Sequence, residues 1–89
     1  MARNPNAATI KNYVNRRRDL QSQIKTLRDS KRQQMASIDS SIRHTKDVNQ
    51  RRTLRSRKAD IRESFNHRID NLQRQSKQLL EQTKLLRRR

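Results

Sequence analysis

Apolar residues recur at steps of three and four positions in both halves of the chain. The first half carries them at Ile10, Leu20, Ile24, Leu27, Met35, Ile38 and Ile42. The second half carries them at Leu54, Ile61, Phe65, Ile69, Leu72, Leu79 and Leu86. The average step is close to the ~3.67 residues of an eleven-residue repeat, which follows one face of an almost straight α-helix. The pattern therefore predicts two long amphipathic helices that pack through these residues.

The two apolar stripes are out of frame with each other. An eleven-residue step from Ile42 falls one position before Leu54, where the second stripe begins. The segment 44–53 between the stripes is mostly polar. Within it, Asp47 and Gln50 fit a capping box, in which each side chain bonds the backbone N–H of the other residue. These features predict a break between two helices.

The start of the first helix has its own signal. Asn4 followed by Pro5 is typical of a helix N-terminus, because Pro at the first helical position needs no hydrogen-bond partner for its nitrogen. The sequence thus predicts an all-α chain in which residues 1–89 form a single basic helical unit. Within this unit it predicts a helix over 5–43, a break over 44–53 and a helix over 54–87.

A break at this place lets the helices fold back on each other as an antiparallel hairpin. Folding at Val48 pairs residues whose numbers sum to about 96, and most of these pairs are apolar on both sides, such as Ile24 with Leu72. Lys31 and Lys58 interrupt the stripes, so their charged heads must either reach out of the packed face or meet a polyanion there. The hairpin is the favoured fold, and the alternative is one continuous long helix in a coiled-coil oligomer.

The composition excludes most chemistry. The 89 residues include no Gly, no Cys and one Pro, which removes glycine-rich phosphate loops, nucleophile elbows, disulfides and thiolate metal sites. His44 and His67 lie in different predicted elements and have no pair of carboxylates beside them, so they are expected to be surface histidines. We expect a protein that is not an enzyme and that uses no cofactor, no metal and no small-molecule substrate.

Positive charge extends along the whole chain. Lys and Arg number 24 against 8 Asp and Glu, which gives a formal net charge of +16, and Arg outnumbers Lys 17 to 7. A guanidinium group can hold two phosphate oxygens at once, so an extended polyanion is the predicted partner, and nucleic acid is the commonest one. The residues predicted to contact phosphates form the densest basic clusters: Arg16, Arg17, Arg18, Arg51, Arg52, Arg55, Arg57, Lys58, Arg87, Arg88 and Arg89.

Recognition of a base sequence is not supported, because the two aromatic residues, Tyr13 and Phe65, lie on the apolar stripes and offer no stacking surface. The favoured function is a structural protein that binds nucleic acid without sequence preference, as in DNA packaging, a nucleoid or a virion interior, with DNA favoured over RNA. Two alternatives stay open: a basic coiled-coil assembly protein on an acidic protein surface, as in a capsid or secretion apparatus, and a small ribosomal RNA-binding protein. A homo-oligomer or a component of a larger assembly is expected.

The expected location follows from the lack of long apolar runs. No segment has enough consecutive apolar residues to span a bilayer or to form the centre of a cleavable signal peptide. We therefore expect no membrane partner. The cytoplasm, a nucleoid or a virion interior is the expected place, and the nucleus is an alternative.

Overall fold

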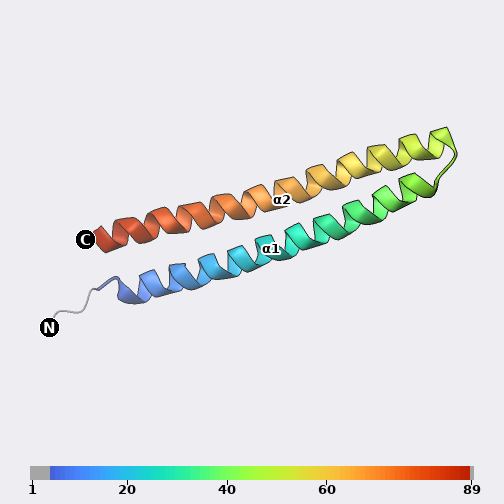
Figure 1. The fold of residues 1–89 in the computed structure, drawn as a ribbon. Helices are drawn as coiled ribbons and strands as arrows, with labels where there is room; N and C mark the ends of the chain where they lie inside the picture. The colour runs from blue at the N-terminus through green and yellow to red at the C-terminus, as the bar shows by residue number, and fades with distance from the viewer. Residues whose placement is uncertain (1–4, 89) are drawn as a thin grey trace. The chain divides into compact units, whose positions relative to one another are not determined.

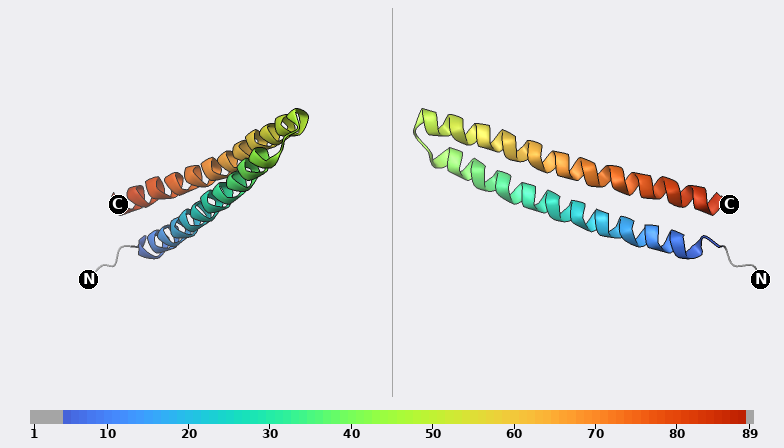
Figure 2. Two further views of the ribbon diagram at one scale, coloured as in Figure 1. Left: turned by 45° about the vertical axis from the view of Figure 1, so that its right-hand side comes forward. Right: turned by 180° about the vertical axis from the view of Figure 1, so that it is seen from behind.

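Two long α-helices make up the protein. The computed structural model describes residues 5–88, in which α1 spans Ala7–His44 and α2 spans Val48–Arg88. The helices pack against each other and run in opposite directions from the turn between them (Figure 1 and Figure 2). The all-α class and the antiparallel hairpin are thus confirmed, and the continuous helix considered as the alternative is not the fold.

Two compact units divide the hairpin. We call Lys25–Ile69 the turn unit, and the described residues up to Ile24 and from Asp70 onward the end unit. Each unit contains a stretch of both helices (Figure 1). Each therefore has its own packed face between α1 and α2, which we call the seam of that unit.

The turn between the helices is shorter than the predicted break over 44–53. α1 continues to His44, and α2 begins at Val48, six residues before the predicted start at 54. The prediction was wrong here because it began the second helix at the first strongly apolar position of the stripe. A helix can begin earlier wherever a side chain caps its free N–H groups.

Asp47 is the residue that caps α2. Its backbone C=O accepts a hydrogen bond from the N–H of Arg51 at 3.0 Å, and its Oδ1 accepts one from the N–H of Asn49 at 2.8 Å. This geometry is that of an N-cap residue, whose carbonyl closes the first helical turn while its side chain satisfies a free donor. Asp47 is therefore the N-cap of α2, but its side chain bonds the N–H of Asn49 and not that of Gln50, which the capping box predicted.

We expect Asp47→Ala to lower the free energy of unfolding by about 1 kcal/mol, because the N–H of Asn49 loses its acceptor. For a domain of this size, such a loss lowers the thermal midpoint by roughly 4–8 °C, which circular dichroism can measure. Asp60→Ala is the matched control, since it removes an equal charge from an exposed position inside α2. Equal shifts in the two variants would contradict the capping role.

α1 begins and ends without Gly. It starts at Ala7 instead of the predicted residue 5, and the C=O of Asn6 accepts the N–H of Ile10 at 2.8 Å. The predicted cap, Asn4, lies outside the described residues. At the other end Thr45 Oγ1 donates to the C=O of Ser41 at 2.6 Å. A hydroxyl group thus satisfies a carbonyl that a glycine-based cap would otherwise serve.

The seam of the turn unit follows the predicted eleven-residue repeat. On α2, Leu54 and Phe65 are 11 positions apart, as are Lys58 and Ile69, and all four are buried or half-buried. An eleven-residue repeat completes about three turns of an α-helix, so equivalent positions stay on one face. The predicted spacing is therefore the observed one in this unit.

The seam of the end unit has a different spacing. On α2 it contains Ser76, Leu79, Thr83 and Leu86, whose steps of three and four alternate as in a heptad repeat. Thr83 is buried, and its Oγ1 donates to the C=O of Leu79 at 2.7 Å. Because this bond satisfies the hydroxyl, a polar residue is tolerated at a packed position.

The core consists of the residues predicted to pack. The buried apolar side chains, each 6–9% exposed, are Ile24, Ile38, Phe65, Ile69 and Leu79. The other residues predicted to pack are all half-buried: Ile10, Leu20, Leu27, Met35, Ile42, Leu54, Ile61, Leu72 and Leu86. No large side chain among residues 5–88 is completely enclosed, because two helices make only a single layer of contact.

Candidate nucleic-acid interface

Two lysines on the apolar stripes bond across the seam of the turn unit. Lys31 Nζ donates to Asn66 Oδ1 at 2.7 Å, and Lys58 Nζ donates to Asp39 Oδ1 at 2.5 Å. In both pairs the residue numbers sum to 97, close to the predicted 96. The lysine stems cover the seam while their heads bond the neighbouring helix at its edge.

The seam of the end unit also contains polar contacts. Arg17 Nε donates to Ser76 Oγ at 3.3 Å, and Asn6 Nδ2 donates to the C=O of Leu86 at 3.4 Å. These residue numbers sum to 93 and 92, which is below the predicted 96. The buried serine gives the guanidinium of Arg17 an acceptor inside the packed face.

The structure places the predicted phosphate-contacting residues in three different situations. Arg17 and Lys58 are half-buried and bond across the seams. Arg89 lies outside the described residues. The others are exposed: Arg16, Arg18, Arg51, Arg52, Arg55, Arg57, Arg87 and Arg88. Two of the predicted contacts therefore take part in helix packing.

Because the Lys58 and Asp39 side chains are 26% and 40% exposed, we expect their ion pair to contribute less than about 1 kcal/mol to stability. Asp39→Asn should lower the thermal midpoint by a few degrees at low salt, and the difference should shrink as salt screens the pair. Asp29→Asn is the control, since it changes the same charge at an exposed position of α1. A salt-independent loss in Asp39→Asn alone would contradict an ionic contribution.

Most of the positive charge among residues 5–88 has no carboxylate partner. Over the part of the chain that the structure describes, Lys58 with Asp39 is the only ion pair between a Lys or Arg and a carboxylate. A histidine and a carboxylate also lie close together, His67 Nε2 and Glu63 Oε1 at 3.7 Å. The turn unit alone contains 13 Lys and Arg against 5 Asp and Glu. Its surplus charge is therefore available to an external anion.

Three arginines of α1 share a side of the helix with Asp39. Residues 4, 7 or 11 positions apart lie on one face of an α-helix. Arg28, Arg32 and Arg43 are 11, 7 and 4 positions from Asp39, and all three are exposed. They therefore line the edge of the turn unit at which Asp39 bonds Lys58.

Three arginines of α2 line the same edge. Arg51 and Arg62 are 7 and 4 positions from Lys58, and Arg55 is 3 positions from it. Because Lys58 crosses to Asp39 on this side, the arginines of both helices face one side of the turn unit. We call this surface the arginine face, and its members are Arg28, Arg32, Arg43, Arg51, Arg55 and Arg62.

The opposite side of the turn unit has a different character. Helical spacing places on it residues that follow the other edge of the apolar stripes, and we call this surface the polar face. Its members are Ser30, Gln34, Ser37, Ser41, Thr53, Arg57, Asp60, Ser64 and Arg68. Hydroxyl and amide groups dominate it, and Asp60 offsets part of the charge of its two arginines. The turn unit therefore carries its charge mainly on one side.

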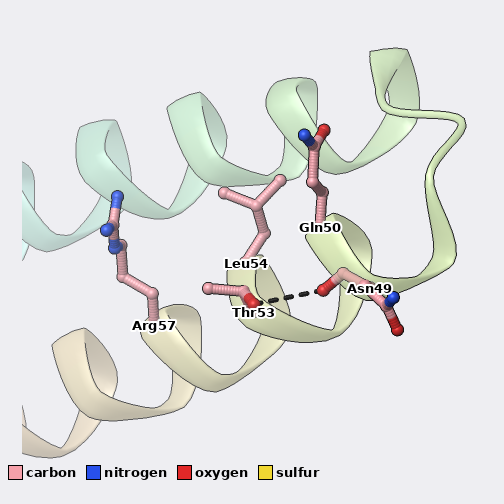
Figure 3. Close-up of a pocket in the computed structure, with 5 residues that line it drawn as sticks. All are labelled: Asn49, Gln50, Thr53, Leu54 and Arg57. Carbon is pink, nitrogen blue, oxygen red and sulfur yellow. Dashed lines mark hydrogen bonds between the residues drawn. The ribbon is translucent and has the colours of Figure 1, made fainter.

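An open groove beside the turn belongs to the polar side. Asn49, Gln50, Thr53, Leu54 and Arg57 line it. Figure 3 shows Gln50, Leu54 and Arg57 projecting from α2 toward α1, while Thr53 Oγ1 donates to the C=O of Asn49 at 3.1 Å. Arg57 is the one titratable side chain of this lining, so the groove contains no acid–base pair.

The described residues contain neither a metal site nor a membrane-spanning segment. Across residues 5–88, no group of three or more His, Asp or Glu side chains is placed to hold a metal ion. Neither helix, over the same residues, contains a stretch apolar enough to cross a lipid bilayer.

Comparisons of the chain with models of protein families, with curated proteins and with solved structures find no match. The function is therefore inferred from the charge and geometry of the chain itself.

Most residues of the arginine face lie outside the dense basic clusters of the sequence, so the sequence-based prediction did not include them. Arg28, Arg32, Arg43 and Arg62 have no basic neighbours dense enough to form a cluster. Adjacent residues point about 100° apart around an α-helix, so a run such as 16–18 spreads over several sides. Recurrence of Arg at steps of 4, 7 and 11 is the signal that would have found these residues.

Proposed function

We propose that the chain is a non-enzymatic structural protein that binds nucleic acid through its phosphates without recognising base sequence. The observation that carries this proposal is the surplus of exposed, unpaired Arg and Lys side chains on a hairpin whose apolar residues pack between its own helices. Such a surface offers a partner positive charge and little apolar area. The partner it fits is a polyanion.

The type of basic residue supports phosphate groups as the target. The arginine face contains six exposed Arg side chains, and the planar fork of each can bind phosphate with two parallel hydrogen bonds. Binding a duplex with such residues releases its condensed counterions, which supplies affinity without any base contact. An elongated array of cations along two helices suits a partner that repeats its charge at regular intervals.

The buried aromatics support tolerance of sequence. Phe65 is only 6% exposed, and Tyr13 is half-buried. Stacking on bases needs exposed rings, and neither of these two rings is fully exposed. We propose DNA packaging, a nucleoid or a virion interior as the setting, in the cytoplasm or, as the alternative, the nucleus. DNA is favoured over RNA, and the protein acts as a homo-oligomer or within a larger assembly.

The test is a fluorescence anisotropy titration of the full chain with two DNA duplexes of equal length and unrelated sequence. At low salt we expect saturable binding, with affinities for the two duplexes that agree within about threefold because phosphates supply the contacts. Undetectable binding would overturn the proposal. A preference above about 100-fold would overturn its sequence tolerance.

Two competitors in the same titration separate the alternatives. Polyglutamate presents carboxylates in place of phosphates, so it should displace the duplex poorly. Strong displacement by polyglutamate would favour an acidic protein surface as the partner. Displacement by duplex RNA at far lower concentration than by duplex DNA would favour the ribosomal alternative.

A further inference from the structure

We propose that a nucleic-acid duplex lies against the arginine face of the turn unit, while the polar face of the same unit stays out of contact. This inference rests on the proposed function and adds the surface and the orientation to it. One consequence is that arginines only two residues apart in sequence, such as Arg55 and Arg57, have different roles.

Charge complementarity selects the arginine face. Six exposed arginines lie there, and the carboxylate of Asp39 on the same side is already bonded to Lys58. The other carboxylate at an aligned position is Asp47, 11 positions before Lys58, and it accepts a hydrogen bond from the N–H of Asn49. Both carboxylates are therefore already partnered when a phosphate approaches. On the polar face Arg57 and Arg68 share the surface with Asp60 and with neutral groups, so the attraction is much weaker there.

The spacing of the arginines suits a phosphate backbone. Arg51 and Arg62 are separated by 11 residues, or roughly 16 Å along the α2 axis, and Arg28 and Arg43 by 15 residues, or roughly 22 Å along α1. Duplex DNA carries one charge per about 1.7 Å of its axis, so each row of arginines meets more phosphates than it can bind. The rows can therefore engage the backbone in several registers.

The width of the hairpin explains why such contacts would not read bases. A single helix of about 10–12 Å fits the major groove, which is about 12 Å wide. Two helices side by side, with axes about 8–10 Å apart, are too wide to enter it together. A broad face formed by both helices must therefore lie across the phosphates, and its contacts carry no sequence information.

The test uses two double variants of the full chain that remove equal charge from α2. Arg55→Gln with Arg62→Gln removes two members of the arginine face, and Arg57→Gln with Arg68→Gln removes the two arginines of the polar face. All four positions are exposed, and Gln has nearly the same helix propensity as Arg, so both variants should keep the fold. Circular dichroism and thermal midpoints verify this before binding is compared.

At about 0.1 M salt the loss of two phosphate contacts should weaken duplex binding by about 60-fold, since each contact contributes about 0.9 to the salt exponent. The polar-face variant should weaken it by less than about fivefold, through net charge alone. If the wild-type chain binds and both variants weaken binding equally, the face assignment is overturned while the proposed function stands. If the wild-type chain does not bind at all, both proposals fall.

Discussion

Phe65→Ala is expected to remove most of the helical circular dichroism of the free protein near room temperature. Phe65 is 6% exposed and is the largest apolar side chain of the seam of the turn unit. Replacing a buried Phe by Ala costs about 3–5 kcal/mol, because transfer free energy is lost and a cavity remains. A hairpin of two helices has no further layer of side chains that could move in to fill that cavity. A loss of this size is a large part of the stability of a typical domain.

The control for Phe65→Ala is Leu85→Ala in the same helix. Leu85 is 58% exposed, so its truncation should leave the thermal midpoint within a degree or two. Both variants keep the net charge, which separates packing from electrostatic effects. A midpoint in Phe65→Ala equal to that of Leu85→Ala would show that the packing of α1 on α2 does not stabilise the fold.

A DNA duplex is expected to raise the thermal midpoint of the wild-type protein by roughly 10–20 °C at low salt. A ligand that binds only the folded chain contributes about 2.7 kcal/mol when its concentration is 100 times Kd. In a domain of this size each kcal/mol changes the midpoint by about 4–8 °C. The phosphates of the duplex also reduce the repulsion among cations that lack carboxylate partners. This repulsion destabilises the free hairpin, so its reduction adds to the rise in the midpoint.

High salt provides the control for this stabilisation. At about 1 M monovalent salt the duplex should no longer change the midpoint, because the electrostatic part of binding is lost. The free protein should itself become more stable as salt screens its repulsion. A midpoint shift that persists in high salt would contradict binding through phosphates, and so would a duplex that lowers the midpoint at low salt.

The fold was largely predictable because the apolar spacing is regular. The stripe from Leu54 to Ile69 fixes which side of α2 is buried, and the frame change before Leu54 places the break. The bounds were less accurate, since the cap at Asp47 starts α2 well before its first apolar residue. Hydrogen bonds of single side chains decide such ends, and hydrophobic periodicity does not record them.

The seam of the end unit shows what apolar spacing alone misses. Ser76 and Thr83 are buried although neither is apolar, because each has a hydrogen-bond partner within the seam. Their partners, Arg17 and the C=O of Leu79, become known only when the two helices are placed side by side. A polar residue at a packed position therefore gives no signal in the sequence unless its partner is also considered.

For the candidate interface, the sequence predicts the type of side chain, Arg and Lys, but not which of these residues share one surface. The surplus of Arg directs attention to exposed cations, but clusters along the sequence place Arg17 and Lys58 among them, and these two bond across the seams. Grouping by helical face instead brings Arg28 and Arg62 to one side of the turn unit. The Lys58–Asp39 contact shows which side of α1 and which side of α2 form one common surface. The periodicity of either helix alone does not contain this information.

The most direct test of the central claim is the salt dependence of duplex binding by the wild-type chain. If the six arginines of the arginine face each neutralise one phosphate, a plot of log K against log salt concentration should be linear with a slope of about −5. The same slope should hold for duplexes of unrelated sequence, because the contacts are to the backbone. A slope near zero with appreciable affinity would contradict the account, since binding would then depend on something other than phosphate charge.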